Sequence, residues 1–232
     1  MIEIQNLTKV YGGETVLDIS LLKINKGDGF GLVGNNGAGK TTLFRLILDL
    51  IRANSGTVLS NGKDVKTSNE WKYYTGSYLD QRFLIDFLTP EEYFEFLNGI
   101  YGLSKGDLEK FYLDFAGFFN DEILGKKKYI RDFSQGNRQK VGIAAALMAK
   151  PEVLILDEPF NGLDPSTQIR LKNLLNKLKS DKEITILVSS HDLKHVTEVC
   201  DRIAVLEKGA IIHDIKTSQG TLKELEGYFS VS

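Results

Sequence analysis

FSQGNRQKVGIAAALMAKPEVLILDEPFNGLDP, residues 133–165, is the stretch of the chain that decides its fold. A short polar loop leads into an apolar segment that favours a helix over 135–149, and the next apolar run predicts a buried strand over 152–156. Two acids, Asp157 and Glu158, come directly after that strand. Because α/β sheets bind ligands at the carboxyl ends of their strands, the two acids mark a candidate site.

A glycine-rich loop earlier in the chain fits the phosphate-binding pattern G-x-x-x-x-G-K-[ST]. Its residues are Gly34, Asn35, Asn36, Gly37, Ala38, Gly39, Lys40 and Thr41. An apolar strand over 30–33 precedes it and an amphipathic helix over 41–50 follows, which disfavours the alternative of a plain glycine-rich turn. Such a loop directs backbone N–H groups at phosphates. We therefore expect Lys40 to reach the β- and γ-phosphates of a nucleotide, Thr41 to ligate Mg²⁺ and Thr42 to contact the α-phosphate.

The two acids complete the expected nucleotide site. Phosphoryl transfer depends on positioning and charge neutralisation more than on covalent chemistry. We expect Asp157 to hold Mg²⁺ through water and Glu158 to polarise the attacking water. The alternative, a strand that merely ends in two charged residues, is disfavoured by the phosphate loop in the same chain.

Net charge, cysteine content and the length of the apolar runs disfavour several classes of protein. A formal charge of -2 gives no electrostatic footprint for nucleic acid, and the short basic run 126–128 is interpreted as a solvated face. The single cysteine, Cys200, excludes an intrachain disulfide, suits a reducing cytoplasm and is expected to be a small buried apolar residue. The alternating residues at the start predict a strand and not a signal peptide, and no apolar run approaches the ~20 residues that span a bilayer. We expect a soluble protein.

Strands and helices alternate along most of the chain, which favours an α/β fold with a mostly parallel sheet and antiparallel strands at the N-terminus. The expected strands cover 2–7, 16–22, 57–59, 74–79, 185–188 and a hairpin over 202–215. Further helices are expected over 165–179, over 192–199 and at the C-terminus.

Residues 86–135 differ from this pattern because they are aromatic-rich and lack strand signals. Thr89 and Glu92 fit a capping box with proline at the first helical position, which predicts a helix to about Tyr101, and a second helix is expected over 107–119. We interpret the region as a helical insert whose aromatic side chains mostly form its own core. These side chains are Tyr93, Phe94, Phe96, Phe111, Tyr112, Phe115, Phe118 and Phe119.

Taken in order, the motifs resemble those of the ATP-binding subunits of ABC transporters, over essentially the whole chain. They are the phosphate loop, Gln81, Ser134-Gln135-Gly136-Asn137, Asp157-Glu158, Gly162-Leu163-Asp164 and His191. The resemblance implies a P-loop NTPase core with a helical subdomain insert, and an ATP hydrolase that uses ATP and Mg²⁺. It also implies one domain over 1–232, with a core ATPase lobe over 1–85 and 136–232 and a helical subdomain over about 86–135.

The family's architecture implies two copies packed head to tail around ATP. Ser134 and Gly136 of one copy would bind the γ-phosphate held by the other, with Ser134 also capping a helix. Asp164, followed by a proline at a helix start, would form the loop that crosses to the opposite site; a plain helix cap is an alternative that can hold at the same time. Tyr11 would stack on the adenine.

Two further residues have catalytic roles by the same resemblance. Gln81 would contact Mg²⁺ or water and sense a transmembrane partner through the helical subdomain. His191 would hydrogen-bond the γ-phosphate and orient the water of Glu158. The spacing of His191 and His195 also fits a zinc pair, but the sequence places no third ligand nearby and lacks H-E-x-x-H.

The signature loop departs from the family's usual Leu-Ser-Gly-Gly-Gln. Here it is Phe133-Ser134-Gln135-Gly136-Asn137, a variant similar to those of bacterial drug and bacitracin export ATPases. Gln135 adds a side chain where the closest approach to the nucleotide is expected. The phosphate-loop lysine, both acids and His191 remain, so the variant does not by itself predict an inactive site.

The resemblance also implies partners and a location. We expect an ATP-dependent homodimer, a transmembrane permease on a separate chain, no nucleic acid, and a cytoplasmic position peripheral to the inner face of the cell membrane.

The chain ends soon after its last strand, without room for the regulatory domain of sugar-importer subunits, which favours export. An alternative is a soluble ATPase of the same superfamily without a transport role, such as an iron-sulfur assembly factor; a neighbouring gene for a polytopic membrane protein would discriminate. A nucleotide-binding module without turnover conflicts with Glu158 and His191.

Overall fold

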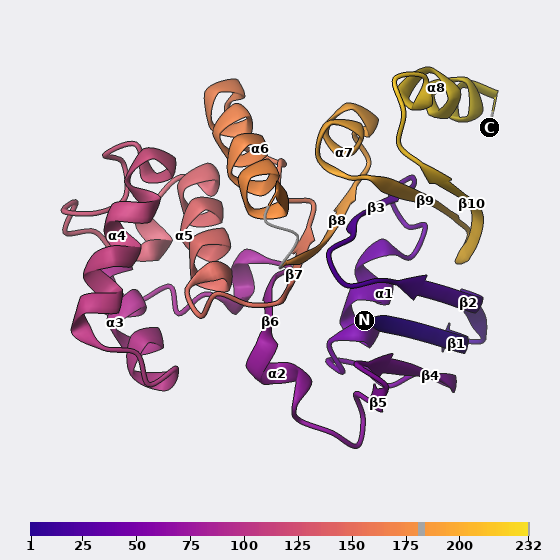
Figure 1. Ribbon diagram of the computed structural model, residues 1–232, viewed down its shortest axis with the longest axis horizontal. Helices are drawn as coiled ribbons and strands as arrows, with labels where there is room; N and C mark the ends of the chain where they lie inside the picture. Colours follow the sequence, from indigo (N-terminus) through magenta and orange to yellow (C-terminus); the bar gives the residue numbers. More distant parts are fainter. Residues whose placement is uncertain (181–183, 232) are drawn as a thin grey trace.

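The computed structural model describes residues 1–180 and 184–231, and its larger sheet lies at the centre of the molecule (Figure 1). This 6-stranded sheet has the order β10-β9-β3-β8-β7-β6. Its strands are β3 (Gly29–Val33), β6 (Thr75–Tyr78), β7 (Val153–Asp157), β8 (Thr185–Ser190), β9 (Arg202–Glu207) and β10 (Ala210–Lys216). Neighbours pair in parallel except in the β9–β10 hairpin, so the carboxyl ends of the parallel strands lie along one edge.

A second sheet, with 4 strands, is antiparallel and contains the N-terminus. Its order is β2-β1-β4-β5, with β1 (Ile2–Tyr11), β2 (Glu14–Ile24), β4 (Ser55–Ser60) and β5 (Lys63–Asp64). Helix α1 (Lys40–Ile47) packs between the two sheets, because its Phe44 shares one apolar cluster with Ile4 of β1 and Ile155 of β7. The antiparallel N-terminal unit expected from the sequence is confirmed.

The inner strands β3, β7 and β8 of the central sheet are buried on both faces, as their continuous apolar runs predict. On β7, Val153 and Ile155 belong to the cluster of α1 and the antiparallel sheet, whereas Leu154 and Leu156 belong to a cluster on the other face. That face is covered by α5 (Gln135–Leu147), α6 (Pro165–Ser180) and α7 (Leu193–Val199), and α8 (Thr221–Val231) packs beside α7 (Figure 1). The molecule is therefore an α/β structure of stacked layers.

The helical insert contains α3 (Pro90–Ile100) and α4 (Lys105–Phe119), which lie at the end of the molecule away from the antiparallel sheet (Figure 1). The predicted capping box is confirmed, because Thr89 Oγ1 accepts from the Glu92 backbone and the Glu92 carboxylate accepts from Thr89 N. Most of the predicted aromatic core is buried, with Phe94 and Phe111 rings edge to face at 5.0 Å. Phe96 is 48% exposed, and Tyr112 is only partly buried.

Helix α1 is shorter than expected at its C-terminal end. The apolar spacing predicts a helix to Leu50, but it ends at Ile47. Asp49 has a φ of 48°, which turns the chain out of the helical direction. Leu50 is consequently half exposed and does not lie on the buried face with Leu43.

A single helical turn, α2 (Trp71–Tyr74), precedes β6 and was not anticipated. It removes Tyr74 from the strand predicted over 74–79. Two 3₁₀ turns, η1 (Gln81–Phe83) and η2 (Ile130–Asp132), also lie outside the predicted elements. Short turns of this kind leave no periodic signal in the sequence.

Two expectations drawn from composition can be compared with the structure. Cys200 is buried at the end of α7, and burial raises the pKa of its thiol to about 12, as befits a small apolar residue. Within residues 1–180 and 184–231, no helix combines the length and apolar character needed to cross a bilayer.

Candidate nucleotide and catalytic site

The phosphate loop lies between the end of β3 and the start of α1. Lys40 opens α1 and is only 6% exposed; its Nζ donates to the Gly34 carbonyl oxygen at 2.7 Å and lies 3.3 Å from Glu158 Oε1. Gly39 has a φ of 111°, which L side chains rarely adopt, and a Cβ on Gly34 would lie 2.3 Å from the carbonyl oxygen of Leu206. The loop thus packs against β9 and directs its lysine at the two acids.

Asp157 is held by two hydroxyl groups at the carboxyl end of β7. Thr41 Oγ1 donates to one carboxylate oxygen at 2.5 Å, and Ser189 Oγ donates to the other. Burial raises the pKa of Asp157, and these two hydrogen bonds oppose that rise. Mg²⁺ prefers hard oxygen ligands, so the hydroxyl of Thr41 and the carboxylate of Asp157 fit this ion. A divalent cation here would favour the ionised carboxylate.

Glu158 connects β7, β8 and α5. Its carboxylate accepts from His191, whose Nδ1 is 2.9 Å from Oε2. Its backbone N–H donates to Ser189 Oγ at 3.0 Å, and its carbonyl oxygen accepts from Gln139 Nε2 at 3.1 Å. The φ of Glu158 is 48°, an uncommon conformation for a residue with a side chain. The side chain that is expected to orient water is therefore held at its carboxylate and on both sides of its backbone.

A cavity of about 480 Å³ opens beside the two acids. Its walls include Asp157, Glu158, Gln81, Gln135 and Gln139. The structure thus brings together Gln81 and both acids, which are far apart in the sequence, because β6 and β7 are neighbours and both point their carboxyl ends at this edge. A cavity with these polar walls, which include Glu158 as the ion-pair partner of Lys40, is suited to hold water beside the two acids.

Ser134 and Asp164 lie at the N-termini of two helices. Ser134 Oγ accepts from Asn137 N at 3.2 Å and so caps α5. Asp164 accepts hydrogen bonds from the side chains and backbone of Ser166 and Thr167 at the start of α6, and these lower the pKa of its carboxyl well below the usual range. Both residues are thus helix caps, and their contribution to a second nucleotide site stays a prediction.

Tyr11 and the two histidines occupy separate places. Tyr11 ends β1 with 47% of its surface exposed, and Lys9 Nζ lies 4.6 Å from its ring centre. His191 contacts Glu158, whereas the ring of His195 stacks on Phe160 at 4.5 Å. His191 and His195, whose spacing also fits a zinc pair, therefore make contacts with different residues.

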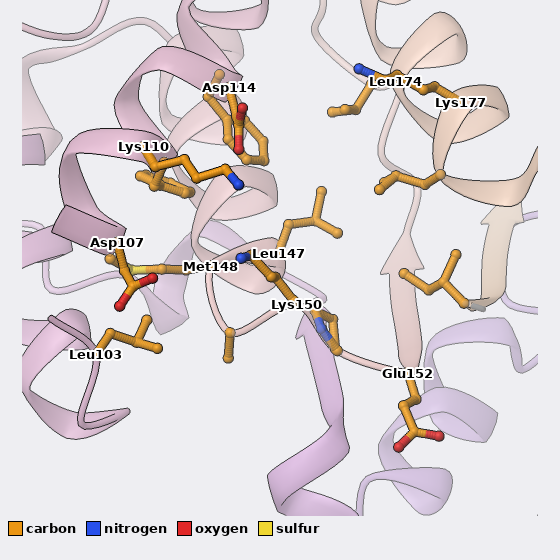
Figure 2. Close-up of a pocket in the computed structure, with 16 residues that line it drawn as sticks. Leu103, Asp107, Lys110, Asp114, Leu147, Met148, Lys150, Glu152, Leu174 and Lys177 are labelled. Carbon is orange, nitrogen blue, oxygen red and sulfur yellow. The ribbon is translucent and has the colours of Figure 1, made fainter. Parts of the chain in front are cut away.

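Another cavity, of about 460 Å³, lies between α4, the C-terminal end of α5 and α6 (Figure 2). Figure 2 shows Leu147 and Leu174 on facing walls, Lys110 on the side of the insert, and Lys150 below Leu147. Glu152 lies there just before the start of β7, whereas Asp157 and Glu158 lie at its opposite end. This cavity is consequently not part of the candidate nucleotide site.

Two residues of the site were missed by the sequence reasoning. Ser189 lies opposite Asp157 in the β7–β8 register, so a correct strand alignment could have indicated it. Gln139 is one helical turn beyond Gln135 on α5, but nothing in the sequence says which carbonyl oxygen its amide meets.

Comparison with known proteins identifies relatives of the whole arrangement. The family model described as ABC transporter matches residues 17–161. The bacitracin transport ATP-binding protein BcrA of Enterococcus faecalis is 38% identical over 221 residues, which cover 94% of this chain and 70% of that protein. The solved structure of an ATP-binding subunit of an ABC transporter has a TM-score of 0.84 at 28% identity, covering 98% of this chain and 93% of that chain. A bacterial ABC transporter cassette solved as a dimer has a TM-score of 0.83 at 25% identity, covering 94% of this chain and 99% of that chain; it is also known in a post-hydrolysis state bound to ADP and Pi.

Proposed function

The chain belongs to the ABC transporter family, as an ATP-binding subunit and ATP hydrolase, and we propose that it drives a transmembrane permease carried on a separate chain. The observation that carries the ATP hydrolysis in this proposal is the convergence of Lys40, Asp157 and Glu158 at the edge where β3 and β7 end. Phosphoryl transfer requires charge neutralisation and a positioned water, and Lys40 and Glu158 can supply these at that edge.

The proposed hydrolysis uses groups that are already in contact. Lys40 would exchange the Gly34 carbonyl oxygen for the β- and γ-phosphate oxygens of ATP and neutralise their charge. Glu158, hydrogen-bonded to His191, would accept a hydrogen bond from the attacking water and hold it in line with the γ-phosphate. Thr41 and Asp157 would hold Mg²⁺, which supplies charge neutralisation at the phosphate oxygens.

The remaining assignments complete the nucleotide site. The backbone of residues 34–39 would cradle the phosphates and Thr42 would contact the α-phosphate. Gln81, in the wall of the same cavity as the acids, would contact the attacking water or Mg²⁺. The half-exposed ring of Tyr11 would stack on adenine.

We propose that two copies pack head to tail when ATP binds. The N-terminus of α5, with Ser134 and Gly136, would then face the γ-phosphate held by the partner copy, where helix dipoles favour anions. The loop capped by Asp164 would cross to the same site. The related bacterial cassette is solved as a dimer, which supports dimerisation of this chain.

Ser134→Arg tests the dimer. The guanidinium would occupy the space that the partner's γ-phosphate needs, so we expect ATP-dependent dimers to be lost in size-exclusion chromatography while each monomer still binds ATP. Ser104→Arg is the control, because Ser104 Oγ likewise accepts from a backbone N–H three residues on at the start of α4, and either substitution removes a cap worth about 1 kcal/mol. Persistent dimers of Ser134→Arg would contradict the assignment.

Exposed aromatic side chains next to Gln81 support a docking surface for the permease. Phe83 and Phe87 are 57% and 62% exposed, and they lie between Gln81 and α3 in the chain. A neighbouring cavity of about 240 Å³ is lined by Phe83 and by Tyr93 of α3. Grouped apolar surface of this kind marks interaction sites, so an apolar segment of the permease would pack here.

The permease proposal is tested by recovering the tagged chain from detergent-solubilised membranes of its host. We expect a polytopic membrane protein in comparable amount, and we expect the double variant Phe83→Ser, Phe87→Ser to lose it while retaining ATP binding. Leu21→Ser is the control, because Leu21 is 59% exposed on the antiparallel sheet. Recovery of soluble proteins alone would instead favour a non-transport ATPase such as an iron-sulfur assembly factor.

The proposal includes the organisation and location of the subunit. Residues 1–85 and 136–232 would form the core ATPase lobe and about 86–135 the helical subdomain, in one domain over 1–232. The subunit would lie at the inner face of the cell membrane, held there by the permease. Export is the proposed direction, and ATP-driven accumulation of substrate in inside-out membrane vesicles would test it.

A further inference from the structure

The segment 158–164 joins the two nucleotide sites of the proposed dimer, because it runs from Glu158 to Asp164. Glutamine side chains of two helices hold its backbone. Gln139 of α5 donates to the Glu158 carbonyl oxygen at 3.1 Å, and Gln168 of α6 donates to carbonyl oxygens further along the segment at 3.4 and 3.3 Å. The first of these bonds lies directly at the residue expected to orient water.

The backbone of Glu158 needs such support. Glu158 has a φ of 48°, a conformation that costs free energy in a non-glycine residue and persists only where the surroundings hold it. Gln139 is 4% exposed, so its amide has little access to water as an alternative partner. Losing this donor would let the backbone relax and move the carboxylate away from His191.

The first turn of α5 contacts the same segment at a second point. Gln135 packs over Gly162, because a Cβ built on Gly162 would lie 2.9 Å from the Gln135 Cδ. A Cβ on Gly136 would in turn lie 2.9 Å from the Gly162 carbonyl oxygen. Gln135 and Gln139 are four residues apart and therefore share a helix face. The start of α5 and the segment 158–164 are thus packed against each other along their length.

We propose that Gln139 is a positioning residue for ATP hydrolysis, which fixes the backbone of Glu158 and links it to the N-terminus of α5 in the same chain. The inference rests on the proposed function, in which that N-terminus binds the γ-phosphate held by the partner copy. A displacement of α5 when the dimer closes would move Gln139 and Glu158 together. Engagement of one nucleotide at α5 would therefore set the position of the carboxylate that serves the other nucleotide.

Gln139→Leu tests the link, because leucine is similar in size and lacks the donor. A misplacement of about 1 Å can cost on the order of a hundredfold in rate, so we expect kcat to fall about ten- to a hundredfold. KM and the Kd for ATP should change much less than kcat, because the amide of Gln139 donates to the backbone of Glu158 and not to a group of the phosphate loop. Asn98→Leu is the matched control: it removes a bond of the same type, from Nδ2 to the Leu103 carbonyl oxygen at 3.0 Å, within the insert. It should keep its kcat.

A variant with both Gln139→Leu and Glu158→Gln shows whether Gln139 acts only by positioning Glu158 or also contributes to hydrolysis on its own. If Gln139 acts only through Glu158, adding Gln139→Leu to Glu158→Gln should cause no further loss of hydrolysis. A multiplied loss, or an unchanged kcat of Gln139→Leu alone, would overturn the inference. Should Gln139→Leu fail to fold, Gln139→Glu serves instead, because it keeps the shape and places an acceptor against the Glu158 carbonyl oxygen. Normal hydrolysis by Glu158→Gln would instead refute the proposed role of Glu158 itself.

Discussion

Glu158→Gln is expected to bind ATP and to hydrolyse it about 10²- to 10⁴-fold more slowly than the unchanged chain. The amide keeps the size of the carboxylate and can still hydrogen-bond His191, which lies 2.9 Å from Oε2. It cannot act as a base towards water. The substitution also removes the ion pair with Lys40, whose Nζ lies 3.3 Å from Oε1, so the lysine remains available to phosphate.

Because hydrolysis reopens the proposed dimer, the Glu158→Gln variant should accumulate a dimer in the presence of ATP. Phosphate release measures the rate, and size-exclusion chromatography with ATP measures the dimer. Glu152→Gln is the matched control, because it makes the same change just before the opposite end of β7, where Glu152 pairs with Lys26 at 2.9 Å. Equal rates for Glu158→Gln and the control, or a monomer with ATP, would contradict the role assigned to Glu158.

The parts of the fold that were predicted from sequence depend on local signals. The capping box at Thr89 and Glu92 determines the start of α3 through contacts three residues apart. The run before Asp157 predicts a buried parallel strand because all its side chains are apolar, and β7 is buried on both faces. The phosphate loop needs only a strand before it and a helix after it. Signals of this kind do not require knowledge of the tertiary structure.

The parts that were missed depend on contacts between distant segments. Gln139 carries no local signal of a role in the site, and its bond to the Glu158 carbonyl oxygen follows from how α5 packs on the central sheet. Ser189 supports Asp157 only because β7 and β8 align in one register. The positive φ of Glu158 likewise has no signature in the sequence, since glutamate rarely adopts it.

The Gln135 departure in the signature loop is explained by a contact of the same kind. The sequence places its side chain where the closest approach to the nucleotide is expected, and the structure packs the same side chain over Gly162 of its own chain. Gly162 has a φ of 71° and offers the space that a side chain would fill. The extra side chain is therefore accommodated within the chain, and the spacing of Ser134 and Gly136 at the helix start is retained.

Lys40→Ala is expected to weaken ATP binding roughly ten- to a hundredfold, because a hydrogen bond to a charged group contributes about 1.5–3 kcal/mol and each 1.4 kcal/mol is a factor of ten. The ammonium of Lys40 is the buried cation beside the phosphate loop, 2.7 Å from the Gly34 carbonyl oxygen and 3.3 Å from Glu158. Isothermal titration calorimetry with ATP measures the loss.

Stability has to be measured alongside, because Lys40→Ala also leaves Glu158 without its cation. Thermal unfolding without nucleotide reports that effect, and binding is compared at a temperature where both proteins are folded. Lys128→Ala is the control, since it removes one exposed lysine from the basic run 126–128 and should bind ATP normally. If Lys40→Ala, folded at that temperature, bound ATP as tightly as Lys128→Ala, the phosphate would have to be held by other groups. The assignment of residues 34–41 as the nucleotide loop would then be wrong, because its single side-chain cation would contribute nothing to the anion it is placed to meet.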